Sequence, residues 1–166
     1  MPSRKENMEL PKRKRTRLKN YDYSTQGAYF VTICTKERKQ YLSKITVGEG
    51  LSALPKNNLT SIGEEVEKSI KYINENYNKA SIEKYVIMPN HIHLIVILQQ
   101  TGRDGTLPLQ SIIGQLKSYT TRKFGDTLWQ RSYHDHVIRG KFDFDKIWQY
   151  IDSNVIQWEK DCFYVE

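Results

Sequence analysis

The stretch at residues 85–98 leads into the most apolar strand of the chain and carries two histidines among large aliphatic side chains. Alternate side chains of a β-strand point to the same face, so His91 and His93 share one face and the aliphatic residues between and after them alternate across the strand. The dipeptide Pro89-Asn90 favours a tight turn. This region therefore predicts two strands joined by that turn, at residues 82–88 and 91–98.

The same periodicity predicts two more strands and three helices. Residues 28–35 and 134–139 have the β-branched and apolar composition of strands. Apolar residues recur at helical spacing in three further segments, at about residues 60–77, 109–124 and 144–155. Thr60 or Ser61 caps the first helix, and Gly125 favours the left-handed conformation that ends the second.

Two polar segments fall between these elements. The stretch after the first strand contains Gly48 and Gly50 and predicts a hairpin or a loop, and residues 99–105 predict a loop. The order βαββαβ plus a helix is that of a ferredoxin-like α+β fold, an antiparallel sheet with its helices on one face and an added C-terminal helix. A chain of 166 residues fits a single domain, which we assign to residues 20–166.

Positive charge is concentrated before this domain. The formal net charge is +7, and residues 1–19 supply +6 of it through eight lysines and arginines against two glutamates. Such a polar segment predicts a flexible arm that binds a phosphate backbone, with a merely solubilising tail as the alternative. The arm residues that we expect to contact nucleic acid are Lys12, Arg13, Lys14, Arg15 and Arg17.

Composition also bears on the compartment. The chain has no run of about 18 apolar residues and its start is too polar for a signal peptide, so we expect no membrane association. Cys34 and Cys162 form no spacing motif, which favours a reducing cytoplasm.

The paired histidines are the first candidates for chemistry. Imidazole nitrogens bind many divalent ions, and two histidines on one face of a strand can chelate a metal ion. Structural histidines are the alternative. A second pair, His134 and His136, flanks a polar residue, and we favour a structural or phosphate-contacting role for His136. Arg131 and Arg139 lie beside that segment and are further candidates for DNA contact.

The helix at 109–124 offers a nucleophile. Tyr119 lies at the edge of its buried stripe, and Gln115 and Lys123 share its face at i, i+4 spacing, with Arg122 beside them. Nearby cations would help a phenol to attack a phosphate. Packing is the alternative role, because the chain has 11 tyrosines.

Several segments resemble a known family, the single-tyrosine transposases of the HUH endonuclease superfamily, and most closely its REP-associated branch. They are MPNHIHLIV, LKSYTTR, WQRSYHDHVIR, YIDSN and the opening RLKNYDYSTQGAYFVTICT, which together extend over most of the chain. The resemblance implies a ferredoxin-like sheet, single-stranded or hairpin DNA as the substrate, and cleavage through a 5′-phosphotyrosine link. It also implies a DNA-associated protein of the bacterial or archaeal cytoplasm, located at the nucleoid.

The resemblance implies a role for individual residues. His91 and His93 become ligands of Mg²⁺ or Mn²⁺ and Tyr119 the nucleophile of a metal-dependent DNA endonuclease and strand transferase. A covalent adduct that survived in Tyr119→Phe would point instead to Tyr133, Tyr150 or another tyrosine. Relatives supply a third ligand, an amide or carboxylate, one turn after the tyrosine. That position is Lys123 here, which cannot ligate when charged. Gln115, one turn before Tyr119, is a candidate substitute.

Two questions stay open at this point. The departure at Lys123 leaves a second interpretation, a domesticated relative with little or no cleavage activity that binds hairpin DNA or RNA. Insertion-sequence relatives form dimers and REP-associated relatives act as monomers, so the resemblance is compatible with either a homodimer or a monomer.

Overall fold

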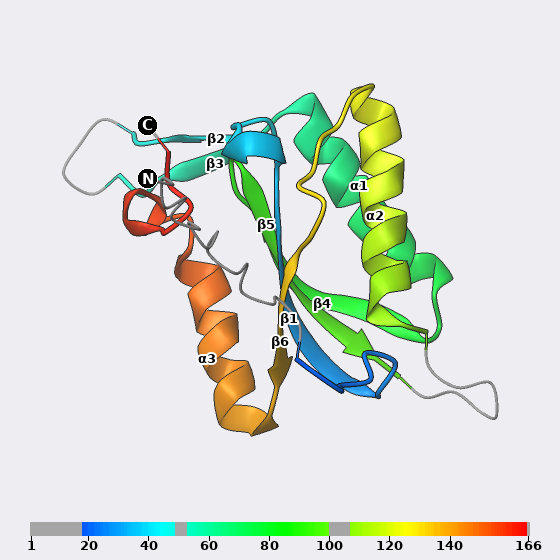
Figure 1. Cartoon of the computed structure of the whole chain (residues 1–166). Helices are drawn as coiled ribbons and strands as arrows, with labels where there is room; N and C mark the ends of the chain where they lie inside the picture. The colour runs from blue at the N-terminus through cyan, green and yellow to red at the C-terminus, as the bar shows by residue number, and fades with distance from the viewer. Residues whose placement is uncertain (1–17, 49–52, 100–106, 166) are drawn as a thin grey trace, which may run out of the picture.

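The computed structural model describes residues 18–48, 53–99 and 107–165. At its centre is a four-stranded antiparallel sheet with the order β4-β5-β1-β6 (Figure 1). The strands are β1 (Gly27–Cys34), β4 (Ala80–Ile87), β5 (His91–Leu98) and β6 (His134–Ile138). All four were predicted, and their order is that of the ferredoxin-like plan, so the predicted fold class is confirmed. Most of the predicted arm, residues 1–17, and of the 99–105 loop lies outside the described residues.

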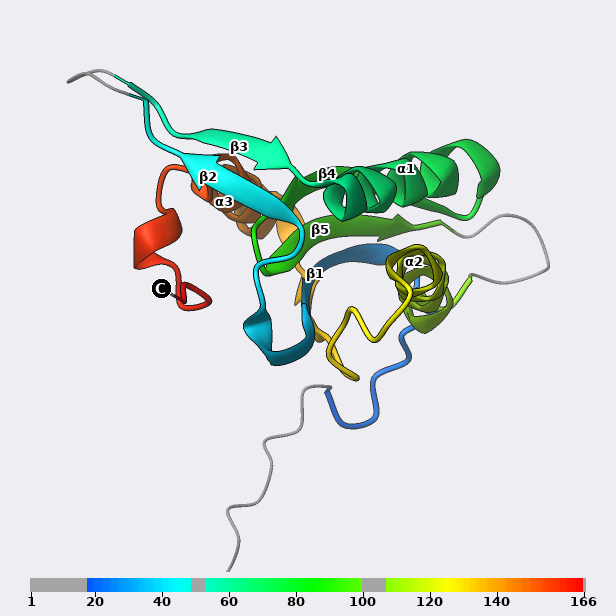
Figure 2. The ribbon, with the colours of Figure 1, turned by 90° about the horizontal axis from the view of Figure 1, so that it is seen from above.

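Two helices cover one face of this sheet. They are α1 (Ser61–Asn76) and α2 (Leu109–Phe124), which lie side by side in both ribbon views (Figure 2). Their apolar stripes pack on alternate residues of β5, including Ile92 and Leu94, and form the larger apolar cluster of the protein. The predicted ends hold, since the Thr60 side chain caps α1 and Gly125 ends α2 with a φ of 82°.

The last helix, α3 (Gly140–Ser153), covers the opposite face of the sheet (Figure 1). It packs there on a smaller apolar cluster centred on Ile95, Ile138 and Ile151. The sequence predicted an added helix but not the face that it covers. This arrangement leaves the histidines of β5 on the α3 side, because their aliphatic neighbours Ile92 and Leu94 point to α1 and α2.

A small hairpin and the C-terminal turn lie at one end of the sheet. Strands β2 (Ser43–Thr46) and β3 (Lys56–Leu59) pair antiparallel, which confirms the hairpin alternative for this region. A short 3-10 helix, η1 (Lys36–Arg38), precedes the hairpin, and another, η3 (Trp158–Lys160), follows α3. Among the described residues, no helix has both the length and the apolar character needed to cross a membrane.

Candidate functional site

The two histidines at the start of β5 converge on one point. Their Nε2 atoms are 3.1 Å apart, and both side chains are buried, with 0% and 1% of His91 and His93 exposed. The alternation of the strand brings them to one face, as the sequence predicted. Convergent ring nitrogens of this kind are the arrangement in which two imidazoles share a cation.

Hydrogen bonds hold the outer nitrogen of each ring. The Asn90 side chain donates from Nδ2 to the carbonyl oxygens of Arg38 and Phe163, so its Oδ1 is the atom that accepts from Nδ1 of His91, at 2.8 Å. The proton of His91 is therefore on Nδ1, and its Nε2 presents a lone pair. His93 Nδ1 is 2.8 Å from the Thr32 hydroxyl, its cross-strand partner on β1. When it donates to that hydroxyl, His93 also presents a lone pair at Nε2.

Burial keeps both rings neutral. It lowers the pKa of His91 to about 2 and that of His93 to about 3, because a charged imidazolium inside the protein would lose its hydration. For His91, the neighbouring His93 and the guanidinium of Arg38 lower the pKa further. A neutral imidazole is the form that ligates a metal ion, so the pair is ready to bind one near neutral pH.

A carboxylate from the C-terminal turn completes a group of three ligands. Asp161 Oδ2 is 3.8 Å from His91 Nε2, and ligand atoms of His91, His93 and Asp161 all lie within 4.8 Å of one another. Oδ1 of Asp161 accepts the backbone N–H of Phe163, at 2.8 Å, which orients the side chain. Asp161 was not predicted from the sequence, because it lies beyond the last helix in a turn without periodicity. Two imidazoles and one carboxylate form a donor set that suits a divalent cation.

Helix α3 brings a tyrosine to the histidine pair. Tyr150 Oη is 3.4 Å from His93 Nε2, and the two rings meet edge to face with centroids 5.2 Å apart. The side chain is partly open, with 39% of Tyr150 exposed. Burial of its phenol raises the pKa of Tyr150 above its ordinary value, and a hydrogen bond from Asn154 opposes this increase.

Asn154 lies one turn after Tyr150, at the C-cap of α3. Its side chain is buried, at 3% exposure, and its Oδ1 has no hydrogen-bond partner among the described residues. A buried amide oxygen without a partner is costly, and a bound cation or water would satisfy it. The signal for this residue was present in the YIDSN segment, where an amide follows a tyrosine at i, i+4 spacing.

The structure does not bring Tyr119 to the histidine pair. Tyr119 lies on α2, on the far side of the sheet from α3, and its hydroxyl donates to Glu65 of α1 at 2.9 Å. This hydrogen bond to a carboxylate raises the pKa of Tyr119, which is the opposite of the activation that we expected from nearby cations. The sequence did not reveal this separation, because helical spacing identifies a buried stripe but not the face of the sheet on which that stripe packs.

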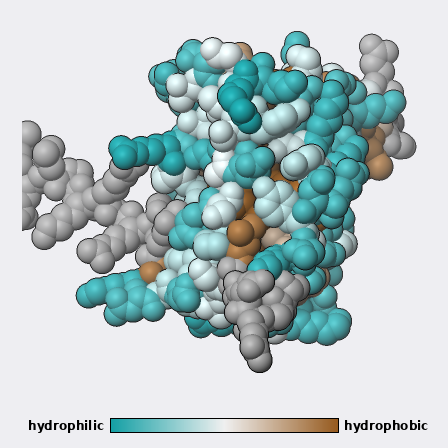
Figure 3. Space-filling view, turned by 90° about the vertical axis from the view of Figure 1, so that its right-hand side faces the viewer, coloured by the Kyte–Doolittle hydropathy of each residue, from teal (hydrophilic) through white to brown (hydrophobic). Residues whose placement is uncertain are grey.

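The neighbours of Tyr119 are separated from the histidines in the same way. Gln115 and Tyr119 line a groove of about 560 Å³ between α1 and α2, together with Tyr72. Figure 3 shows this face, where a narrow apolar strip is surrounded by hydrophilic side chains. Arg122 and Lys123 are exposed on the same helix. Neither Gln115 nor Lys123 is therefore placed to ligate a metal ion at the histidine pair.

The other predicted residues lie elsewhere. Tyr133 is buried in the larger apolar cluster, which removes it as an alternative nucleophile at the pair. Arg131 and Arg139 are exposed, and His136 Nε2 is 2.9 Å from Asp143 Oδ2 on α3. The predicted DNA contacts of the basic arm, at positions 12–15 and 17, lie outside the described residues.

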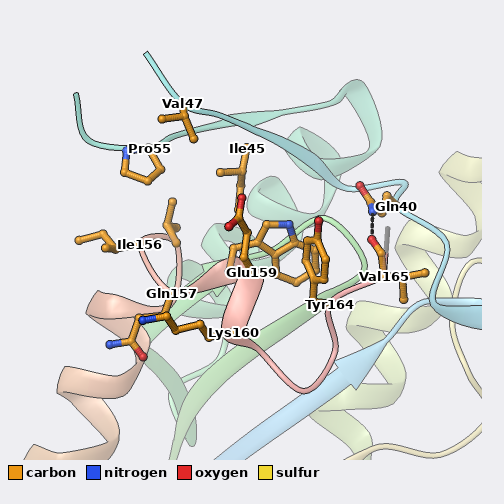
Figure 4. A pocket seen from close by; sticks show the side chains of 12 residues that line it. Gln40, Ile45, Val47, Pro55, Ile156, Gln157, Glu159, Lys160, Tyr164 and Val165 are labelled. Carbon is orange, nitrogen blue, oxygen red and sulfur yellow. Dashed lines mark hydrogen bonds between the residues drawn. The ribbon is translucent and has the colours of Figure 1, made fainter. Parts of the chain in front are cut away.

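The C-terminal turn closes the histidine pair from the outside. The Phe163 ring lies with its centroid 4.6 Å from that of His91, and the Arg38 guanidinium carbon is 5.3 Å from the same Phe163 ring. Trp158 lies 6.0 Å from His91 and separates the pair from a cavity of about 380 Å³ under the β2–β3 hairpin. Figure 4 shows that both apolar side chains, such as Ile45 and Val47, and polar ones, such as Glu159 and Lys160, line this cavity.

The candidate site therefore combines a buried histidine pair on the central strand β5 with a tyrosine of helix α3. The model of one family, described as transposase IS200 like, matches residues 23–154, and the chain belongs to that family. An uncharacterized protein of Haemophilus influenzae is 32% identical over an alignment of 184 positions, gaps included, which spans 98% of this chain and 98% of that protein.

A solved structure has the same fold. It is a REP-associated tyrosine transposase bound to a REP hairpin, which matches 86% of this chain and 73% of its own with a TM-score of 0.63 and 22% identity. At that identity the likeness shows the fold alone.

Proposed function

We propose that this transposase cleaves and rejoins single-stranded DNA through a covalent bond between the strand and Tyr150. A divalent cation, Mg²⁺ or Mn²⁺, would be held by His91, His93 and Asp161, with Asn154 as a further ligand. The observation that carries the proposal is the 3.4 Å approach of Tyr150 Oη to His93 Nε2, beside two converging lone-pair donors. The unpartnered oxygen of Asn154 supports the same site.

We assign a separate role in the reaction to each group of the site. A divalent cation bound there would draw charge from the scissile phosphate. The phenol of Tyr150 loses its proton to solvent and attacks phosphorus, the bond to the 3′ oxygen breaks, and that oxygen takes up a proton from solvent. The products are a free 3′-hydroxyl and a 5′-phosphotyrosine link. The Asn154 amide, by donating to the phenolic oxygen, favours its deprotonated form against the effect of burial. One phosphoester replaces another, so the 3′-hydroxyl can reverse the reaction without ATP.

DNA with a hairpin is the substrate that we favour. The family supports a DNA partner, and the structurally similar transposase was solved with a REP hairpin. The +6 charge of residues 1–19 would grip phosphates near the hairpin, and Arg131 and Arg139 are exposed for further contacts. Because Tyr150 approaches His93 of its own chain, we propose that one chain can supply a complete site.

Two matched variants test the nucleophile. Tyr150→Phe and Tyr119→Phe each remove one hydroxyl from a partly exposed helix tyrosine. With labelled hairpin-bearing single strands and Mn²⁺, we expect a covalent adduct on denaturing gels for the wild type and for Tyr119→Phe, and none for Tyr150→Phe. An adduct that survives in Tyr150→Phe and disappears in Tyr119→Phe would reverse our assignment.

A second candidate function is binding of hairpin nucleic acid without cleavage. The observation that favours it is the burial of both histidines beneath Phe163, because a phosphate cannot contact His91 or His93 in this conformation. Under this alternative the wild type would give a retarded complex on native gels and no covalent band at any Mn²⁺ concentration.

A further inference from the structure

Helix α3 carries the proposed nucleophile but packs on the sheet through few apolar side chains. Of its 14 residues only Ile151 is buried, while Phe144, Ile147 and Trp148 are partly buried. By contrast, α1 and α2 each bury five or more residues. Apolar packing alone therefore restrains the position of α3 less than that of the other helices, and polar contacts between α3 and the sheet gain weight.

A β-bulge in β4 turns one polar side chain, that of Lys84, toward α3. Ile82 pairs with Val96 of β5, and the next paired residue is Lys84, opposite Ile95, so the register shifts by one residue at Glu83. Ile82 and Val96 belong to the larger cluster under α1 and α2, whereas Ile95 belongs to the cluster under α3. Regular alternation would have placed Lys84 on the same face as Ile82. The extra residue turns Lys84 to the α3 face instead.

On that face Lys84 contacts two residues of α3. Its ammonium group forms an ion pair with Asp152 and lies 4.6 Å from the centroid of the Trp148 ring. The Lys84 side chain is 25% exposed and that of Asp152 54%, so solvent screens the ion pair mainly from the Asp152 side. Trp148 and Asp152 lie one helical turn apart, on either side of Tyr150 in the sequence. One side chain of β4 therefore holds the turn of α3 that carries Tyr150.

We propose that Lys84 is a positioning residue for the strand-transfer reaction, which fixes α3 and thereby sets Tyr150 against the histidine pair. This inference rests on the proposed function, because it assigns a role to Lys84 only if Tyr150 is the nucleophile. The expected effect is large for a residue whose side chain contacts Asp152 and Trp148 rather than the histidines, since a misplacement of about 1 Å of a reacting group can slow a reaction about 100-fold.

The test compares two lysines that both pair with aspartates of α3. Lys84→Met keeps an apolar side chain of similar length and removes the ammonium group that contacts Asp152 and Trp148. Lys141→Met is the matched control, because Lys141 is 88% exposed and pairs with Asp145 within the same helix. The measurements are the rate of adduct formation at saturating hairpin DNA and the hydrogen–deuterium exchange of α3 amides in the free protein.

We expect Lys84→Met to slow adduct formation at least about tenfold and to increase exchange over residues 147–153, with the DNA affinity unchanged. Lys141→Met should change neither rate nor exchange. Lys84→Arg and the charge-swapped pair Lys84→Glu with Asp152→Lys should recover most of the rate, which a mere loss of folding would not do. Equal rates for Lys84→Met and the wild type would overturn the proposal, as would an equal loss in Lys141→Met or a failure of Lys84→Arg to recover.

The proposed function and the positioning role of Lys84 can be refuted separately. If the wild type forms no adduct through Tyr150, the proposed function fails, and the catalytic role of Lys84 fails with it. If the wild type does form that adduct but Lys84→Met leaves its rate and the exchange of α3 unchanged, only the role of Lys84 is wrong. The exchange measurement needs neither DNA nor metal, so it reports directly on how Lys84 restrains α3.

Discussion

Lowering the pH from about 7.5 to about 5.5 should destabilise the protein through its buried histidine pair. Burial lowers the pKa of His91 to about 2 and that of His93 to about 3, whereas an unfolded histidine has a pKa of about 6.5. Between these values the unfolded chain binds more protons than the folded one. The free energy of unfolding therefore falls as the pH falls through this window.

The size of the effect follows from the pKa of the unfolded state. At a pH of about 5.5, protonation stabilises each unfolded histidine by about 1.4 kcal/mol, so the pair loses about 3 kcal/mol of folding free energy. The folded-state pKa values lie well below this pH, so the loss depends little on their exact size. For a domain of this length the loss corresponds to a decrease of about 6–12 °C in Tm.

Urea unfolding followed by tryptophan fluorescence, in the presence of a chelator, measures this dependence. The double variant His91→Gln with His93→Gln should lose most of the slope between the two pH values. His136→Gln is the control, because it removes an exposed histidine on the neighbouring part of the sheet. If the wild type and the double variant lost the same free energy on acidification, other groups would account for it and our reasoning would be refuted.

Three further predictions concern the site and the fold. Mn²⁺ at about 100 times its Kd should raise the free energy of unfolding of the wild type by about 2.7 kcal/mol. The increase in Tm that measures this stabilisation should vanish in His91→Gln. Phe163→Ala should expose His91, which accelerated modification by diethyl pyrocarbonate would detect. Gly125→Ala should cost about 1 kcal/mol in urea unfolding because its φ of 82° disfavours a side chain; an unchanged midpoint would contradict this.

The sequence was informative wherever a local pattern decides the structure. Alternation along β5 placed both histidines on one face, and the Thr60 cap and Gly125 set the ends of helices that the apolar spacing had already located. These features depend on neighbours a few residues apart, and the same chemistry governs them in any fold. Residue types and spacing were therefore sufficient to predict the four strands of the sheet, the order of the elements along the chain and the histidine pair of the candidate site.

The other half depends on contacts that spacing does not reveal. Tyr119 and Tyr150 both lie on amphipathic helices, and only the packing of α2 and α3 on opposite faces separates them. Asp161 reaches His91 from a turn that is 70 residues away in the sequence, where no periodicity points to a metal site. The bulge at Glu83 is likewise absent from the pattern, because a strand with one extra residue has the same composition as a regular strand.

The division of the protein into two apolar clusters has a consequence for inheritance. Neither the proposed metal ligands nor Tyr150 belong to the larger apolar cluster, and Tyr150 is 39% exposed. A gene copy that loses the Tyr150 hydroxyl or the Asn154 amide would therefore still encode a well-folded chain. Selection against misfolding cannot remove such copies, so silent descendants can persist and acquire new uses. Positions 150 and 154, rather than expression or stability, would then distinguish active lineages from silent ones.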